Sequence, residues 1–182
     1  MVTLDSLEKI NLTELGDLIT ESQFRSYFLD QPGKEHYRLL AYLSTQYNNA
    51  TLLDVGTYKG CSAVALSFNP TNRIVSFDIE QGTISINSKP NNVDFIVDDI
   101  LKKDYVKLIL SSPLVLLDTA HEGPFEHQFY FHLCDIGWKG TLLLDDINLN
   151  NEMRDFWESI KKEKHDLTSI GHHSGTGLVI FK

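Results

Sequence analysis

The sequence predicts an α/β fold of the Rossmann-like, doubly wound type, a mostly parallel seven-stranded sheet with helices on both faces. Five short apolar runs each end at aspartate, and enough chain separates successive runs for one crossover helix. Two further strand-like runs lie around "HHSGTG" near the C-terminus. They indicate an antiparallel hairpin at the end of the sheet. A surface turn explains His172 and His173, and the alternative is that they reach a ligand pocket.

The five apolar runs have the length and composition of strands that are buried on both faces. Parallel strands end at one rim of a sheet, where ligands bind in open α/β folds. One aspartate at such an end is equally well explained as a turn residue, but five in succession favour a functional rim. The runs cover residues 51–56, 74–80, 93–100, 114–120 and 141–147, and their acids are Asp54, Asp78, Asp98 or Asp99, Asp118, and Asp145 with Asp146.

Amphipathic patterns predict helices over residues 34–47, 124–137 and 150–164. Pro124 suits a first helical turn, Gly137 a C-terminal stop, and Asn150 an N-cap. Small residues after Gly60 predict a further helix there. The side chains expected in the core are His36, Leu39, Leu40, Leu43 and Tyr47, then Phe125, Phe129, Leu133 and Ile136, then Met153, Phe156, Trp157 and Ile160.

Composition limits the partners of this 182-residue chain, which has a formal net charge of −9. Little positive charge is present to replace the counterions of a phosphate backbone, so nucleic acid is not an expected partner. The N-terminus carries acids where a signal peptide needs basic residues, and no apolar run is long enough to span a membrane. We therefore expect a soluble cytoplasmic protein, with Cys61 and Cys134 as free thiols in helices.

The loop from Asp54 to Ser62 contains glycines at positions 56 and 60. It lacks the third glycine of the dinucleotide signature G-x-G-x-x-G and the G-K-[ST] of a phosphate-binding loop. Carboxylates along the rim would also repel the phosphates of NAD or of a nucleoside triphosphate. The electrostatics therefore favour a cationic or neutral nucleoside as the ligand.

At these residues the chain resembles the class I S-adenosylmethionine-dependent methyltransferases, and more narrowly the small O-methyltransferases related to the catechol and macrolide-sugar enzymes. The resemblance runs from about residue 32 to the C-terminus. S-adenosylmethionine carries a sulfonium and an ammonium group but no phosphate, so an acidic rim suits it. The matching segments are "LLDVGTYKGCSAVALS", "VSFDIE", "FIVDDI", "VLLDTAHEG" and "GTLLLDDI".

The resemblance implies which residues hold the cofactor. Asp78 would accept the two ribose hydroxyls, and Ile79 and Ile100 would enclose the adenine ring. The adenine amino group would donate to Asp99, or to Asp98 if the register differs by one residue. Tyr58 would either close over the amino-acid tail or stand exposed in its loop. The methionine portion would be bound by Asp54, Gly56, Thr57, Tyr58, Gly60 and Ser62, with Asp118 nearby.

Methyl transfer requires an acceptor that is oriented, desolvated and deprotonated. By the resemblance, Asp118, Asp145 and Asp146 would lie beside the sulfonium, where their carboxylates suit Mg²⁺ or another divalent cation. Without a metal, Asp118 would contact the cofactor and the Asp145–Asp146 pair would cap the loop.

The catalytic set predicted here is His121, Asp118 and Asp145. The macrolide-sugar enzymes carry an Asp-Gly-Asp sequence whose second acid is the base, whereas this chain has Asp118-Thr119-Ala120 followed by His121. Histidine can act as a base near neutral pH, so His121 is the candidate. Alternatively, His121 caps the following helix or contacts the cofactor.

The predicted activity is O-methylation of a hydroxyl on a small molecule or sugar, carried by one domain over residues 1–182. Residues 1–30 are expected to form one or two helices that cover an edge of the sheet or the cofactor mouth, and residues 32–182 the cofactor-binding core. Short connections suggest an open site, a large acceptor such as a glycan or peptide, or a pocket completed by a partner subunit, as in a homodimer. The alternatives are a non-catalytic S-adenosylmethionine-binding or assembly protein and an NAD-dependent oxidoreductase.

Overall fold

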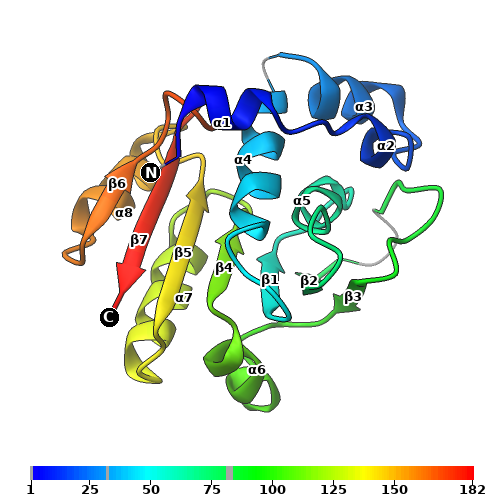
Figure 1. Cartoon of the computed structure of the whole chain (residues 1–182). Coiled ribbons are helices and arrows are strands. Elements are labelled where there is room, and N and C mark those ends of the chain that lie inside the picture. The colour runs from blue at the N-terminus through cyan, green and yellow to red at the C-terminus, as the bar shows by residue number, and fades with distance from the viewer. Residues whose placement is uncertain (1, 32, 81–83) are drawn as a thin grey trace.

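The computed structural model describes residues 2–31, 33–80 and 84–182 (Figure 1). The elements in chain order are α1 (Leu4–Glu8), α2 (Thr13–Gly16), α3 (Ser22–Leu29), α4 (Lys34–Ser44), β1 (Thr51–Val55), α5 (Cys61–Leu66), β2 (Arg73–Asp78), β3 (Val93–Val97), the 3₁₀ turn η1 (Lys103–Tyr105), α6 (Val106–Ser111), β4 (Leu114–Leu117), α7 (Pro124–Asp135), β5 (Gly140–Asp145), α8 (Asn151–Ser159), β6 (Lys164–Asp166) and β7 (Thr176–Phe181).

Seven strands form one sheet in the order β3-β2-β1-β4-β5-β7-β6 (Figure 1). Strands β1 to β5 are parallel, and β7 runs antiparallel to both β5 and β6. The predicted mostly parallel sheet with a C-terminal antiparallel hairpin is thus confirmed. The strand order reverses between β1 and β4, so a crevice opens at their carboxyl ends.

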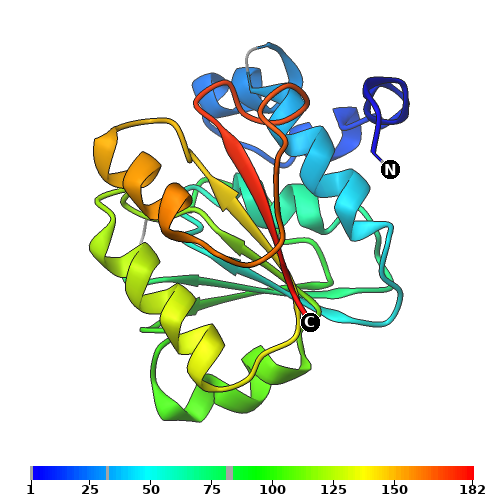
Figure 2. The ribbon, with the colours of Figure 1, turned by 90° about the vertical axis from the view of Figure 1, so that its left-hand side faces the viewer.

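Side chains along the parallel strands alternate between two hydrophobic clusters. Leu53 and Val55 of β1 belong to the cluster that contains α6, α7 and α8, whereas Leu52 belongs to the cluster with α4 and α5. Figure 2 shows these two helical layers on opposite sides of the sheet. Both faces of the sheet are therefore buried, which explains the nearly unbroken apolar runs in the sequence.

Local capping residues set several of the predicted helix boundaries, whereas α8 ends at Ser159 and not at the predicted residue 164, where β6 begins. Helix α7 begins at Pro124, and Gly137 with φ of +67° follows its C-terminal end. The Asn150 side chain accepts a hydrogen bond from the Met153 N–H at 2.8 Å and so caps α8. Helix α4 ends at Ser44, so Tyr47 lies beyond the helix although it packs against the same cluster.

The prediction of a crossover helix between all successive parallel strands is wrong for β2 and β3. The described residues of this connection, 79–80 and 84–92, contain no helix. Asparagine and proline are frequent there and disfavour helix. Instead, Ile86 forms an isolated antiparallel bridge with Ile19, and the Asn87 N–H donates to the Leu18 carbonyl at 2.6 Å. The connection is thus held by the N-terminal segment.

Helices α1, α2 and α3 lie across the carboxyl end of the sheet, at the top of Figure 1. Leu7, Leu12 and Phe28 are buried and join the cluster around α4. The described N-terminal residues thus contain three short helices, where the sequence suggested one or two.

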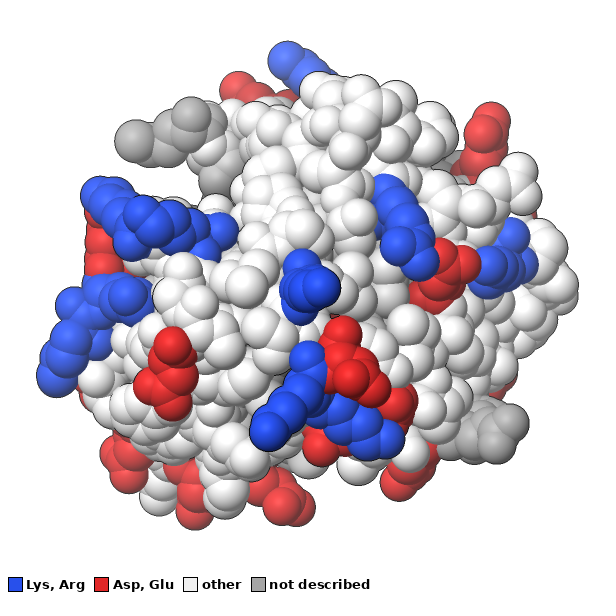
Figure 3. All heavy atoms as spheres, turned by 90° about the horizontal axis from the view of Figure 1, so that it is seen from below, with Lys and Arg blue, Asp and Glu red and all other residues white. Residues whose placement is uncertain are grey.

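Charged side chains are mixed on the face seen from below in Figure 3, at the amino ends of the parallel strands. Lys and Arg form small separate groups there, several of them beside Asp or Glu, and no continuous basic surface extends over this face. Among the described helices, none is both long and apolar enough to cross a bilayer.

Gly56 allows the ends of β1 and β4 to approach closely. Its φ is +95°, and a Cβ at this position would lie 1.8 Å from the Asp118 carbonyl oxygen. Its N–H donates to the Phe77 carbonyl of β2 at 2.8 Å. The turn therefore brings three strand ends together and requires the absence of a side chain.

We expect Gly56→Ala to lower the free energy of unfolding by at least about 2 kcal/mol more than Gly137→Ala. Both positions have a left-handed φ, which costs alanine roughly 1–2 kcal/mol. Only at Gly56 would the added Cβ meet backbone, since a Cβ at Gly137 would have nothing within 4 Å. Urea denaturation measures both losses, and equal values would contradict the close approach of β1 and β4.

Candidate active site

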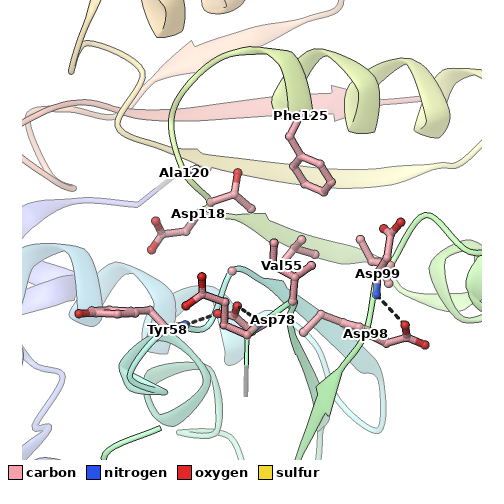
Figure 4. A pocket seen from close by; sticks show the side chains of 14 residues that line it. Val55, Tyr58, Asp78, Asp98, Asp99, Asp118, Ala120 and Phe125 are labelled. Carbon is pink, nitrogen blue, oxygen red and sulfur yellow. Dashed lines mark hydrogen bonds between the residues drawn. The ribbon is translucent and has the colours of Figure 1, made fainter. Parts of the chain in front are cut away.

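Two adjoining cavities lie at the carboxyl ends of β1, β2 and β4. The first has a volume of about 380 Å³. The second, of about 240 Å³, shares Gly56, Tyr58, Asp118 and Thr119 with the first and reaches Phe24 of α3 and Tyr37 of α4. The first cavity, shown in Figure 4, is lined by Val55, Gly56, Tyr58, Phe77, Asp78, Ile79, Glu80, Asp98, Asp99, Ile100, Asp118, Thr119, Ala120 and Phe125.

Asp54 is fully buried beneath the glycine turn. Its Oδ2 accepts hydrogen bonds from the hydroxyls of Ser62 at 3.0 Å and Ser76 at 2.6 Å. Burial raises the pKa of Asp54 to about 6, although the two serine hydroxyls oppose this shift. Ser62 and Thr57 are among the described residues that line the second cavity, whereas Asp54 lines neither cavity. Asp54 therefore orders the turn from below.

Asp78 ends β2 with its carboxylate at the first cavity (Figure 4). Its Oδ2 accepts the Tyr58 N–H at 2.8 Å, and its Oδ1 accepts the Glu80 N–H at 3.0 Å. These bonds orient the carboxylate, and each oxygen retains a lone pair for a ligand hydroxyl. Tyr58 itself has φ of +43° and is 56% exposed, a strained loop conformation of the kind found at binding sites.

Asp98 and Asp99 have different surroundings, although both border the first cavity. Asp98 accepts hydrogen bonds from the Tyr105 hydroxyl at 2.8 Å and from the Lys102 ammonium. These hydrogen bonds lower its pKa. Asp99 is exposed, and its Oδ1 accepts the neighbouring Leu101 N–H at 2.9 Å. In Figure 4 the Asp99 carboxylate rises toward the level of Phe125, while that of Asp98 points the other way.

Apolar side chains form the part of the cavity near these acids. Ile79 is 77% exposed directly after β2, whereas Ile100 is buried. Phe125 also lines the cavity and packs on Phe129 with ring centroids 6.1 Å apart. Helical periodicity predicts a core position for Phe125, because it does not distinguish a cavity from the core.

The N-terminal helices contact the glycine turn at the entrance to the second cavity. The Lys59 ammonium donates to Glu21 at 2.9 Å, and Glu21 also accepts the Ser85 hydroxyl. The Phe24 and Tyr58 rings meet edge to face at 5.8 Å. The N-terminal segment therefore lies at the mouth of the cavities.

The ends of β4 and β5 bring three aspartates together with three histidines. His121 Nε2 lies 3.3 Å from Asp118 Oδ1, and His121 Nδ1 lies 3.8 Å from an Asp146 oxygen. A second side of Asp146 contacts His172 Nδ1 at 2.9 Å and the Ser174 hydroxyl. The expectation of a surface turn is thus wrong for His172, because residues 171–175 fold back onto Asp146.

His36 approaches the same cluster from α4. Its Nδ1 lies 3.4 Å from Asp145 Oδ1, and both side chains are buried. Amphipathic spacing predicts His36 on the core face of its helix, and the burial of His36 is confirmed. The spacing did not predict that a carboxylate would lie next to it.

Burial and crowding shift the titration of this cluster. Burial and the charges of Asp118 and Asp146 raise the pKa of Asp145 well above its usual range. Burial also acts to raise the pKa of Asp146, but the hydrogen bonds from His172 and Ser174 outweigh it and lower that pKa. Burial lowers the pKa of His36 to about 4. Burial therefore favours the neutral form of both side chains in the contact between His36 and Asp145.

His121 has the opposite shift. Burial acts to lower its pKa, but the hydrogen bond and the charge of Asp118 outweigh burial and raise it. The backbone φ of His121 is +57°, and that of Asp146 is +58°. Both residues thus hold uncommon left-handed conformations beside the cavity.

Glu126 holds the loop that carries His121. The side chain is buried at the start of α7 and accepts hydrogen bonds from the Thr119 hydroxyl at 2.6 Å, the His121 N–H at 3.0 Å and the Gly123 N–H at 2.9 Å. Glu126 was not identified from the sequence, although a glutamate three residues into a helix is a known capping signal.

The donor atoms in this cluster form two groups that could hold a metal ion. One group contains His36, Asp118 and Asp145, and the other contains His121, Asp145 and Asp146, with the donor atoms of each group within 4.8 Å of one another. Asp118 and Asp146, which were predicted to share one site, fall into different groups with Asp145 common to both. A histidine is part of each group.

No protein-family model and no curated protein matches this sequence. The three-dimensional fold, by contrast, matches solved structures along nearly its whole length. The methyltransferase PaMTH1 of Podospora anserina, solved with bound SAH, superposes with a TM-score of 0.61 at 14% identity, over 94% of this chain and 87% of that chain.

Two further structures show the same likeness. The O-methyltransferase of Bacillus cereus in complex with SAH has a TM-score of 0.54 at 14% identity, over 98% of this chain and 90% of that one. A candidate caffeoyl-CoA O-methyltransferase of Staphylococcus aureus has a TM-score of 0.61 at 12% identity, over 100% and 93%. The chain therefore has the class I S-adenosylmethionine-dependent methyltransferase fold.

The raised pKa of Asp54 predicts a pH-dependent stability. A carboxyl whose pKa moves from 3.8 to about 6 on folding stabilises the fold at low pH and loses about 3 kcal/mol of that contribution as pH rises through 6. We expect Asp54→Asn, which stays neutral, to gain stability relative to wild type between pH 4 and pH 7.5.

Chemical denaturation at both pH values measures this change. Asp155→Asn, an exposed acid on α8, is the matched control and should not change its difference from wild type. A difference between Asp54→Asn and wild type that is the same at both pH values would contradict the buried carboxyl described here.

Proposed function

We propose that this protein is an S-adenosylmethionine-dependent methyltransferase that acts on a hydroxyl of a small molecule or sugar. The observation that carries the proposal is the acidic cavity at the reversal of strand order, with the glycine turn on one side and exposed Ile79 on the other. A cofactor with positive charge and no phosphate suits this lining. The shared fold with SAH-bound methyltransferases supports the same conclusion.

In this proposal the nucleoside occupies the first cavity. Asp78 accepts the ribose hydroxyls, and its two backbone hydrogen bonds hold it in place for that role. Asp99 accepts the adenine amino group, because Asp98 is already engaged by Lys102 and Tyr105. Ile79, Ile100 and Phe125 provide the apolar surface for the ring.

The methionine portion then extends into the second cavity, along the backbone from Gly56 to Gly60 and toward Ser62. Asp118 borders both cavities and lies where the sulfonium would stand. His121 lines the second cavity beside Asp118, so it is positioned to remove a proton from an acceptor hydroxyl. The N-terminal helices at the mouth limit the access of water.

A divalent cation fits the cluster around Asp145. Asp145 Oδ1 and His36 Nδ1 are buried atoms that lack a hydrogen-bond partner among the described residues, as expected of metal donors. Asp145 would hold the ion together with Asp118 or Asp146, the second acid of each donor group. When bound, it would lower the pKa of the acceptor hydroxyl.

Calorimetry with S-adenosylmethionine tests the cofactor site. Asp78→Ala removes two charge-assisted hydrogen bonds and should weaken affinity by at least about a hundredfold. Asp99→Ala should weaken it by about tenfold or more, whereas Asp98→Ala, its matched control, should have little effect. Absence of S-adenosylmethionine binding by the wild type would overturn the proposal. A larger loss of affinity in Asp98→Ala than in Asp99→Ala would assign the adenine amino group to Asp98.

Transfer of a radioactive methyl group to a panel of hydroxyl compounds tests the reaction. We expect His121→Ala to bind the cofactor normally and to slow transfer by roughly 10²–10⁴-fold, the usual contribution of a general base. His165→Ala, an exposed histidine on β6, is the control and should retain the wild-type rate. Normal turnover by His121→Ala would remove it from the mechanism, and cofactor binding without any transfer would favour a non-catalytic binding protein.

A further inference from the structure

Two buried polar atoms face each other where α4 meets the end of β5. His36 is 5% exposed and Asp145 is 6% exposed, and Nδ1 of one lies 3.4 Å from Oδ1 of the other. Neither atom has a hydrogen-bond partner among the described residues. A buried polar atom without a hydrogen-bond partner destabilises the fold, so two of them in contact call for a ligand that satisfies both.

Asp118 completes a group of three donors with this pair. One donor atom from each of His36, Asp118 and Asp145 lies within 4.8 Å of the other two. The three residues come from α4, from the end of β4 and from the end of β5, so only the assembled fold brings them together.

We propose that His36 is a metal ligand, and that His36, Asp118 and Asp145 bind a divalent transition metal such as Zn²⁺ in preference to Mg²⁺. This inference rests on the proposed function, since it identifies the chemical class of the divalent cation assigned there. Mg²⁺ prefers a shell of oxygen ligands and keeps much of its water. An imidazole nitrogen beside carboxylates instead suits zinc, iron or nickel.

The separation of the His36–Asp145 pair agrees with this choice. Ligand atoms about 2.1 Å from a tetrahedral Zn²⁺ lie about 3.4 Å from each other. The His36 nitrogen and the Asp145 oxygen are 3.4 Å apart. Adjacent oxygens around an octahedral Mg²⁺ lie closer, at about 3.0 Å.

Contacts from the terminal hairpin hold the carboxylates beside the metal-donor group in place. His172 Nδ1 lies 2.9 Å from Asp146 Oδ1 and 3.6 Å from Asp145 Oδ1, and Ser174 donates to the same Asp146 oxygen. Such outer contacts fix the orientation of metal-binding side chains. His172 is therefore engaged with Asp146, which distinguishes it from His36.

Co²⁺ titration of the full-length protein, after treatment with EDTA and dialysis, tests this proposal, because the visible bands of Co²⁺ become much stronger when the ion leaves its six-coordinate water shell for a four- or five-coordinate protein site. We expect the wild type to bind Co²⁺ with such bands. Stoichiometric Zn²⁺ should displace the Co²⁺, and millimolar Mg²⁺ should not.

The variants locate the ligand. His36→Ala should weaken Co²⁺ affinity by roughly a hundredfold or more, since even an outer contact of a metal site is worth ten- to a hundredfold. His36→Gln preserves much of the side-chain volume without the imidazole nitrogen and should show the same loss. It carries the test if the alanine variant does not fold, as judged by circular dichroism. His165→Ala controls for Co²⁺ binding by an exposed histidine.

The proposal would be overturned if the wild type showed no Co²⁺ bands, or if Mg²⁺ displaced Co²⁺ as readily as Zn²⁺ does. It would also be overturned if a folded His36 variant kept the wild-type affinity for Co²⁺.

S-adenosylmethionine affinity, measured in EDTA, separates this proposal from the proposed function. Cofactor binding and transfer without Co²⁺ binding would overturn the metal proposal alone. Co²⁺ binding without cofactor binding would overturn the methyltransferase proposal and leave the ion site.

Discussion

The crowding of carboxylates at one rim of the sheet is the constraint on which the rest of the site depends. Like charges in a partly buried environment repel strongly, so each carboxylate needs its own compensation. Asp54 accepts hydrogen bonds from two serine hydroxyls. Asp146 is hydrogen-bonded to His172 and Ser174. Asp118 lies beside His121. Asp145 Oδ1 has no hydrogen-bond partner among the described residues, and burial with the charges of Asp118 and Asp146 raises the pKa of this carboxyl. It is also the acid common to both groups of potential metal donors.

The scaffold holds these groups close through backbone contacts that leave little freedom. Gly56 lies directly against the Asp118 carbonyl, which joins the ends of β1 and β4. Glu126 fixes the loop between β4 and α7 through three hydrogen bonds, so that His121 keeps a left-handed conformation beside Asp118. Strain of this kind persists only where the surroundings determine it, and here the helix cap and the strand ends provide those surroundings.

The acidic rim, the glycine turn and the N-terminal cover form one arrangement around the cavities. Glu21, Lys59 and Phe24 connect the cover to the turn that lies beneath it. The connection from β2 to β3 lacks a helix in its described residues and is held by that same cover. The cover thus contributes both to the fold and to the entrance of the site.

The sequence by itself determined the sheet, most of its helices, and the placement of acids at one rim, because buried parallel strands and helix caps are encoded by neighbouring residues. It also marked Asp78, Gly56 and His121 for the site. Tertiary structure alone decided that His36 and His172 meet Asp145 and Asp146, that Phe125 borders a cavity, and that Asp98 is already engaged by Lys102 and Tyr105. These contacts join elements that lie far apart in the chain. Helical or strand periodicity predicts which face of an element is buried but not which side chains pack against that face.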